Sequence, residues 1–392
     1  MGQKLHRGRR SVFRKRRTGL KTFAWILVAV VIIAGGYLAA MMLGQKGNTS
    51  VQTDATPTIS QTAPTPTESA KPTDPTTLNT DTSVTVQNGL RGFYLPHSML
   101  SADTLSDTLA AAKQAGFTAV VFDLKDTEGR LYYRFSAAQA KQVNSYTDNA
   151  LTKKQLKALF SLIKEAGLSP APRLHAFRDN LGAKALPEAR VSYKENPSWS
   201  WFDGKDSTTS KRWLSPYDND AHDYIGALAE ELKALGAGAV MLDSVQFPNP
   251  KLTTRASFGA DNANLKWDEV LTLFVGKMKE QLGEDCPVIL ACTGESVLEN
   301  ATQIYGGNPL TFTPTVAAPL VSPDKVQESV EAMILRTNVM EENEKPLLAP
   351  MLDVDGCSAT KVKAAIADCA SGGTENYILY SSKGTYDFDA YQ

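Results

Sequence analysis

Apolar and polar positions follow two different periods from Leu90 to the end of the chain. Short, almost continuously apolar runs, such as TAVVFDLK at 118–125, are typical of strands buried on both faces of a parallel sheet. Between them, apolar residues recur three and four positions apart, as Leu156, Leu159 and Ile163 do, which indicates amphipathic helices. The predicted strands are 90–95, 118–125, 168–177, 239–247, 287–293, 311–319, 346–354 and 376–382. The predicted helices are 103–115, 152–166, 220–235, 267–282, 323–340 and 358–370.

Eight strands separated by helices predict a parallel sheet with right-handed crossovers. Eight such units favour a closed (β/α)8 barrel, the TIM-barrel fold, over an open doubly wound sheet. No Gly-x-Gly-x-x-Gly motif follows an early strand, which argues against a dinucleotide-binding sheet. Two features fit the barrel poorly. Pro314 and Pro319 interrupt the sixth strand, and too few residues follow Ser382 to form an eighth outer helix.

The amino-terminal part of the chain has a different composition. Nine of the 41 Lys and Arg residues lie in residues 1–21, which contain no Asp or Glu. Residues 22–43 carry no charge, and as a helix they would span about 33 Å, enough for a bilayer core. The basic segment should stay in the cytoplasm, which places everything after Leu43 outside. We therefore expect an uncleaved single-pass anchor; a cleaved signal peptide is the alternative, with a weak cleavage site after Ala40.

Residues 44–88 are expected to form an extracellular linker. Thirteen Thr and five Pro lie between Thr49 and Thr85, and large apolar residues are few. Such a segment cannot bury enough surface to offset the entropy lost on ordering, so we expect an extended, semi-stiff stalk. It would join the membrane anchor to one globular domain at residues 89–392. The chain beyond residue 21 carries more acidic than basic residues, which makes nucleic acid an unexpected partner.

Several polar residues fall at the carboxyl ends of the predicted strands, where the active sites of such barrels lie. Asp123 and Asp243 stand inside apolar runs, where a carboxylate needs a partner or a function. Glu295 and Asp353 follow the fifth and seventh strands, where turn and capping roles are the ordinary alternative. The further candidates for substrate binding are Tyr94, His97, Lys125, Asp126, Arg173, His175, Trp213 and Gln246.

Four segments together resemble the putative glycosyl hydrolase domain family, which is related to the α-amylase-type barrels. They are RGFYLPHSML, AVVFDLKDTEGRLYY, WLSPYDNDAHDYIGALAEEL and GAVMLDSVQFP, in matching order over about residues 90–250. The resemblance implies a TIM barrel that acts on polysaccharide, often at a bacterial surface. Ser244 and Gln246 stand where the family has Tyr and Arg, and Ser215 where it has Asn. Without this Arg, the site lacks a permanently charged, bidentate partner for a carboxylate or a sugar oxygen. A non-catalytic carbohydrate-binding or envelope-scaffolding barrel is therefore the alternative to a glycosidase.

Glycoside hydrolysis needs two carboxylates that face each other across the scissile bond. The α-amylase family places its nucleophile on strand four, its acid/base on strand five and a further Asp on strand seven. The resemblance therefore implies Asp243 as nucleophile, Glu295 as general acid/base and Asp353 as a charge-stabilising or sugar-binding residue. A rival assignment pairs Asp243 with Asp123 or Asp126.

Aromatic side chains gather on the long loop after the third strand. Trp199, Trp201 and Phe202 lie there together with Trp213, which belongs to one of the family segments. Flat rings suit the apolar faces of sugars, although the same rings could pack the loop onto the barrel. The expected partner is thus a polysaccharide or cell-wall glycan, with Trp213 as the foremost aromatic contact.

No cofactor or metal is expected. The chain has no His-Glu-x-x-His or Cys-x-x-Cys motif, so only His97 and His175, meeting at the barrel mouth, could begin a metal site. The absence of a Gly-x-Ser-x-Gly motif argues against an α/β-hydrolase esterase.

The four cysteines do not predict a disulfide framework. Cys286 and Cys292 would be too far apart along a strand to form a bridge, as would Cys357 and Cys369 along a helix. A cross-pair such as Cys292–Cys357 stays possible, and buried free thiols are favoured.

Overall fold

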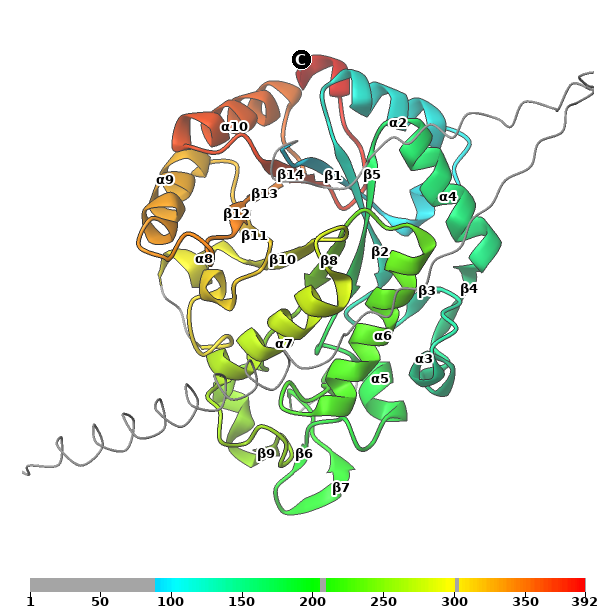
Figure 1. Cartoon of the computed structure of the whole chain (residues 1–392), viewed down its shortest axis with the longest axis vertical. Coiled ribbons are helices and arrows are strands. Elements are labelled where there is room, and N and C mark those ends of the chain that lie inside the picture. The colour runs from blue at the N-terminus through cyan, green and yellow to red at the C-terminus, as the bar shows by residue number, and fades with distance from the viewer. Residues whose placement is uncertain (1–88, 205–208, 300–302, 392) are drawn as a thin grey trace, which may run out of the picture. The chain divides into compact units, whose positions relative to one another are not determined.

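The computed structural model describes residues 89–204, 209–299 and 303–391. Eight parallel strands in this part of the chain close into a barrel surrounded by helices (Figure 1), which confirms the eight-unit barrel. Each strand pairs with two neighbours, and β1 closes the ring by pairing with β14 and β2. Around the barrel the strands are β1 (Arg91–Leu95), β2 (Ala119–Lys125), β5 (Ser169–His175), β8 (Val240–Asp243), β10 (Val288–Thr293), β11 (Val316–Val321), β13 (Met351–Asp353) and β14 (Tyr377–Tyr380).

The predicted basic segment, anchor and linker, residues 1–88, lie outside the described residues. Among the helices that the structure describes, none has the length and apolar content needed to cross a membrane.

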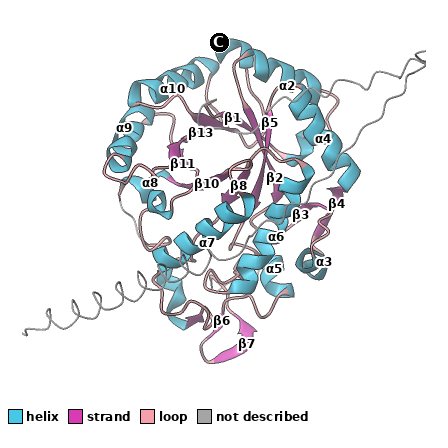
Figure 2. Ribbon diagram, viewed as in Figure 1, coloured by secondary structure: helices cyan, strands magenta, loops and turns pink. Residues whose placement is uncertain are grey.

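Amphipathic helices cover the outside of the barrel, as Figure 2 shows. Helix α4 illustrates why they form. Thr152 and Gln155 make a reciprocal capping box at its start, and its apolar stripe from Leu156 to Ile163 is buried against the strands. The outer helices are α2 (Leu105–Gln114), α4 (Lys153–Glu165), α6 (Asn219–Leu235), α7 (Trp267–Leu282), the short α8 (Gly294–Leu298), α9 (Val326–Thr337) and α10 (Ala359–Gly372).

The core has two layers. One lies between strands and helices, and the other fills the lumen of the barrel with small and branched side chains such as Ala171 and Met241. Strand side chains alternate between these layers, so a residue two positions beyond a luminal one also faces inward. Asp123, Arg173 and Asp243 stand two positions beyond luminal residues of β2, β5 and β8. These three side chains therefore project into the mouth at the carboxyl ends of the strands.

Two insertions that the sequence pattern did not predict leave this end of the barrel. The first comprises β3 (Leu131–Tyr133), α3 (Ala138–Val143) and β4 (Tyr146–Leu151), and it extends the sheet beside β2. The second follows β5 and contains α5 (Asn180–Ala185), β6 (Ser192–Tyr193) and β7 (Asn196–Ser200). With β9 (Ala256–Ser257), β6 and β7 form a small antiparallel sheet that projects beyond the helical ring (Figure 1). β6 and β9 have two residues each and β7 is mostly polar, so none of them shows the apolar run or the alternation that predicts a strand.

The sixth barrel strand differs from its prediction. It begins at Val316, because residues Pro309–Phe312 form the 3-10 turn η3 and Thr313 takes a left-handed backbone conformation. Pro319 fits inside this strand because its nitrogen faces a gap in the neighbouring strand. The Ala317 carbonyl accepts from the Ala349 N–H, and the nitrogen of Pro319, two residues on, faces the same neighbouring strand. That strand is interrupted between β12 (Leu347–Leu348) and β13, so the N–H that proline lacks is not needed there.

A single 3-10 turn, η4 (Phe388–Tyr391), takes the place of the eighth outer helix. The Phe388 ring packs edge-on against Phe93 at 5.1 Å and Phe117 at 5.2 Å, so one aromatic cluster closes the gap beside β1.

All four cysteines are free thiols, as the sequence favoured, and the Cys292–Cys357 bridge is not formed. Burial raises the pKa of Cys286 to about 11 and that of Cys369 to about 12, which keeps both thiols protonated and unreactive.

Candidate active site

One arginine joins two carboxylates at the mouth of the barrel. Arg173 on β5 approaches Asp123 with Nε 2.5 Å from Oδ1 and Nη2 3.1 Å from Oδ2. Its Nη1 lies 3.4 Å from Oδ2 of Asp243 on β8. Because both carboxylates contact the same planar guanidinium, these oxygens lie within about 8 Å of each other. The structure thus brings together Asp123 and Asp243, the two acids that the sequence placed inside apolar strands.

Two tyrosines, Tyr94 on β1 and Tyr380 on β14, contact the arginine of this ion pair. The guanidinium of Arg173 lies 4.8 Å from the Tyr94 ring and 5.6 Å from the Tyr380 ring. The Tyr94 hydroxyl donates to Asp123 Oδ2 at 2.9 Å, and burial together with Asp123 raises the pKa of this phenol, so it stays a donor. Tyr380 is not among the residues predicted from the sequence, although its place two residues beyond the luminal Ile378 could have identified it.

The two carboxylates differ in environment. Burial would raise the pKa of Asp123, but Arg173 and the Tyr94 hydroxyl outweigh burial and lower that pKa below its ordinary value. Asp123 is therefore ionised at neutral pH and cannot act as a proton donor. The Asp243 side chain is 24% exposed, against 14% for Asp123, and its contact with Arg173 is longer. Asp243 is thus the carboxylate that a bound ligand could reach.

Ser244 fixes the orientation of Asp243. Its backbone is left-handed, with φ of 53°, which a residue other than glycine adopts at an energetic cost. In this conformation the Ser244 N–H donates to Asp243 Oδ1 at 2.5 Å, and its Oγ lies 2.9 Å from His175 Nδ1. Burial lowers the pKa of His175, so the imidazole is neutral at pH 7. Backbone strain at one residue therefore orients a carboxylate against a neutral histidine.

This strain gives a measurable expectation. Ser244→Gly and Ser244→Ala both remove the hydroxyl that contacts His175, but only glycine accepts the left-handed backbone freely. We expect Ser244→Gly to be more stable than Ser244→Ala by about 1 kcal/mol. Urea denaturation of the two variants measures the difference, and equal stability would show that the backbone at this position is unstrained.

Lys125 is part of the packing beneath the mouth, away from solvent. Its side chain is fully buried, with Nζ 2.9 Å from Asp179 Oδ2 and bonded to the carbonyl of His175. Gly129, with φ of 85°, lies so close that an added Cβ would stand 1.8 Å from Asp179 Oδ1. This differs from the expectation that Lys125 binds substrate: its ammonium is buried and joins the end of β2 to Asp179 and to the end of β5.

Asp126 shapes the adjoining turn. Its Oδ1 accepts from the backbone N–H groups of Glu128 and Arg130, and its Oδ2 accepts from the Tyr132 hydroxyl at 3.0 Å. The His97 ring lies against Tyr132, with centroids 4.6 Å apart. The structure therefore links the predicted residues Asp126 and His97 through Tyr132 on the rim of the mouth.

Trp213 does not offer an open face to a sugar in this structure. The residue is 4% exposed, and its indole N–H donates to Asp203 at 2.9 Å. Trp201 is also buried, so both rings pack the insertion onto the barrel. Packing was the alternative to sugar binding for these rings. Trp199, on β7, is 64% exposed.

The remaining candidates lie around the mouth. Glu295 opens the short helix α8 after β10, and Asp353 ends β13; both side chains are exposed. Within the described residues, neither forms a hydrogen bond or an ion pair with the Asp123–Arg173–Asp243 cluster. Gln246 accepts from the Tyr305 hydroxyl at 3.4 Å, and Tyr305 in turn accepts from the Thr293 N–H.

No set of three His, Cys, Asp or Glu side chains among the described residues is arranged to hold a metal ion.

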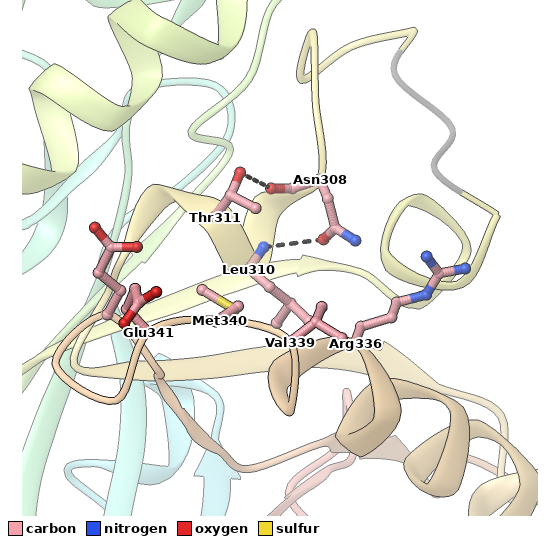
Figure 3. A pocket seen from close by; sticks show the side chains of 8 residues that line it. Asn308, Leu310, Thr311, Arg336, Val339, Met340 and Glu341 are labelled. Atoms are coloured by element: carbon pink, nitrogen blue, oxygen red, sulfur yellow. Dashed lines mark hydrogen bonds between the residues drawn. The ribbon is translucent and has the colours of Figure 1, made fainter.

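A cavity of about 440 Å³ lies elsewhere, between η3 and the end of α9. Figure 3 shows Thr311 and Leu310 bonded to Asn308 on one side of it, with Arg336 and Val339 on the other. None of the residues of the carboxylate cluster lines this cavity, so it is separate from the candidate active site.

The solved structures that match this chain are only distantly related to it in sequence. A chitobiase from Flavobacterium johnsoniae is 14% identical over 76% of this chain and 45% of its own, with a TM-score of 0.48. A noncanonic maltogenic alpha-amylase from Thermotoga neapolitana is 11% identical over 76% of this chain and 68% of its own, with a TM-score of 0.43. A hypothetical protein from Ruminiclostridium thermocellum is 20% identical over 50% of this chain and 96% of its own, with a TM-score of 0.42. The chain thus spans less than half the length of the chitobiase.

No curated protein matches this chain in sequence. The model of one family does match, over residues 92–303, which is more than half of the chain, and its description is "Putative glycosyl hydrolase domain". The matched region includes the strands that carry Asp123, Arg173 and Asp243, and it confirms the resemblance drawn from the four sequence segments. The chain belongs to the putative glycosyl hydrolase domain family.

Proposed function

We propose that the barrel is a glycoside hydrolase that acts on polysaccharide and that Asp243 is its essential carboxylate. One observation carries the proposal: two acids from separate strands, Asp123 and Asp243, share the guanidinium of Arg173 at the mouth of the barrel. Barrels of this type build their active sites at that end. Membership of the putative glycosyl hydrolase domain family supports a glycan as the substrate.

The environments of the two acids assign their roles. Asp243 has one oxygen fixed by the Ser244 N–H and is partly exposed, which suits a nucleophile or a base. Asp123 is held ionised by Arg173 and Tyr94, which suits electrostatic stabilisation of the positive charge that develops on the sugar ring. Glu295 follows β10, the strand that pairs with β8, and its exposed carboxyl is the proposed general acid. Asp353, at the end of β13 two strands beyond β10, is proposed to bind a sugar hydroxyl.

Glu295→Gln tests the acid role through the leaving group. The variant should lose most turnover of natural glycans, by about 100-fold or more, because their leaving oxygen must be protonated. It should retain turnover of an aryl glycoside such as a dinitrophenyl glycoside, whose leaving group needs no proton. Equal losses on both kinds of substrate, measured as kcat/KM, would remove Glu295 from this role.

The proposal itself is tested by measuring new reducing ends after incubation of the full chain with bacterial and plant polysaccharides. We expect release from at least one glycan. Glu230→Gln, at an exposed site on α6, is the matched control and should behave as the parent does. Binding of a glycan without release of reducing ends would overturn the proposed hydrolase activity. It would favour the non-catalytic barrel, the alternative suggested by Ser244 and Gln246.

We further propose that residues 22–43 anchor the chain in a membrane, with residues 1–21 cytoplasmic, residues 44–88 as linker and the barrel outside. The uncharged span and the basic residues before it support this arrangement. Protease added to intact cells should digest the barrel, whereas protection of the barrel until the cells are broken would contradict the topology.

A further inference from the structure

The insertion after β5 carries two arginines, Arg190 and Arg212, on two segments that run antiparallel beside its small sheet. The Val191 N–H donates to the Trp213 carbonyl, and the Val191 carbonyl accepts from Trp201, so this stretch lies between two antiparallel neighbours. Arg190 forms an antiparallel bridge with Leu214, two residues beyond Arg212. Positions two residues apart in an extended chain share a face, so Arg190 and Arg212 lie on the same face of these two paired segments.

Both guanidinium groups are held in place by neutral partners. Arg190 Nη2 donates to the Ser198 carbonyl at 2.6 Å, while its Nε is buried and has no hydrogen-bond partner. Arg212 Nη1 donates to Asn180 Oδ1 at 3.2 Å, and its guanidinium lies 4.5 Å from the centre of the Phe202 ring. Two fixed cations with donors to spare are a prearranged receptor for an acidic group.

The charges of this pair are not neutralised within the described residues. Nearby basic residues do have acidic partners: Lys211 lies 2.9 Å from Glu128, and Arg255 lies 2.9 Å from Glu195. Neither Arg190 nor Arg212 forms an ion pair with a carboxylate in the part of the chain that the structure describes. Burial, and then the proximity of Arg190, lower the pKa of Arg212, as expected of neighbouring like charges. An anion bound between them would relieve this repulsion.

We propose that Arg190 and Arg212 bind an acidic group of the glycan, so that the substrate is an anionic polysaccharide. The acidic group is a carboxylate of a uronic acid or a phosphate, both of which match the planar fork of arginine. The inference rests on the proposed function, since the glycan is its substrate. The insertion that carries both arginines begins at the carboxyl end of β5, after His175. The Leu214 N–H donates to the carbonyl of Phe177, two residues beyond β5, so the segment that carries Arg212 returns to the mouth, and a glycan bound there can extend onto it.

Binding of defined polymers tests the proposal in the full chain carrying Asp243→Asn, which keeps the glycan intact. The probes are polygalacturonate for carboxylate, poly(glycerol phosphate) for phosphate and dextran as the neutral polymer. We expect one acidic polymer to bind, and the double variant Arg190→Gln/Arg212→Gln to bind it about tenfold more weakly or worse, because charge-assisted contacts are lost. Arg255→Gln, whose guanidinium already pairs with Glu195, should change binding less than twofold.

Arg212→Gln alone and Arg190→Lys keep the test valid if the double variant folds poorly. The first should weaken binding, and the second should retain part of it because the charge remains. Equal binding of dextran and the acidic polymers, or unchanged binding in the double variant, would overturn the inference. Release of reducing ends from a neutral glycan, with no binding of either acidic polymer, would also overturn the anion site, while the proposed hydrolase activity would stand. Arginine-dependent binding of an acidic polymer with no release from any glycan would support the anion site and overturn the hydrolase.

Discussion

Replacing Lys125 with Met is expected to lower the free energy of unfolding by about 3–5 kcal/mol. The side chains of Lys125 and Asp179 are both fully buried, and Nζ lies 2.9 Å from Oδ2. Removing the ammonium leaves the Asp179 charge buried without its partner, which costs far more than the ion pair itself contributes. Lys125 also bonds the carbonyls of His175 and Ala176, so the end of β5 would lose its support. Urea denaturation of the full chain measures the loss.

Lys277→Met is the matched control for this prediction. Lys277 pairs with Asp223 at 2.5 Å, but both side chains are partly exposed to solvent. Exposed pairs contribute little, so this change should cost less than about 1 kcal/mol. A loss at Lys125 as small as the loss at Lys277 would show that the buried pair does not hold the loop.

Asp243→Asn is expected to lower kcat/KM at least about a thousandfold, which corresponds to about 4 kcal/mol of transition-state stabilisation. An amide is a far weaker nucleophile and base than a carboxylate, but it is the same size and can still accept from the Ser244 N–H. The melting temperature should therefore stay close to that of the parent. Reducing-end release from the glycan that the parent cleaves measures the effect.

Glu230→Gln, made and assayed in parallel, should keep parental turnover, since this acid lies exposed on α6. Turnover retained in Asp243→Asn would remove Asp243 from catalysis under either pairing, with Glu295 or with Asp123.

Most strands of the barrel were predictable because they are short apolar runs buried on both faces, whereas the start of the sixth strand depends on the turn before Val316. The same rule identified Asp123 and Asp243, since a carboxylate inside such a run is rarely without a role. Their shared partner was not predictable. Asp123 pairs with Arg173 because β2 and β5 are in register there, and Arg173 reaches Asp243 because β8 follows on its other side. Register and closure arise from the whole barrel, beyond any local pattern.

The insertions explain the remaining differences. The family segment predicts Trp213 as a sugar contact, but the segment folds against the barrel and buries the ring. The place of Lys125 at a strand end predicts a substrate contact, but the chain after β5 brings Asp179 against its ammonium. Local spacing cannot show which face of an irregular loop a side chain takes, because long-range packing decides that.

The most direct measurement is a crystal structure of the Asp243→Asn variant with an oligosaccharide bound. We expect a sugar ring at the mouth of the barrel, with its reacting carbon about 3.5 Å from the side chain at position 243. A hydroxyl or glycosidic oxygen should also lie within hydrogen-bond distance of Arg173 or Glu295. A sugar bound only away from the mouth, as in the cavity between η3 and α9, would contradict the assignment of this cluster as the site of glycan cleavage.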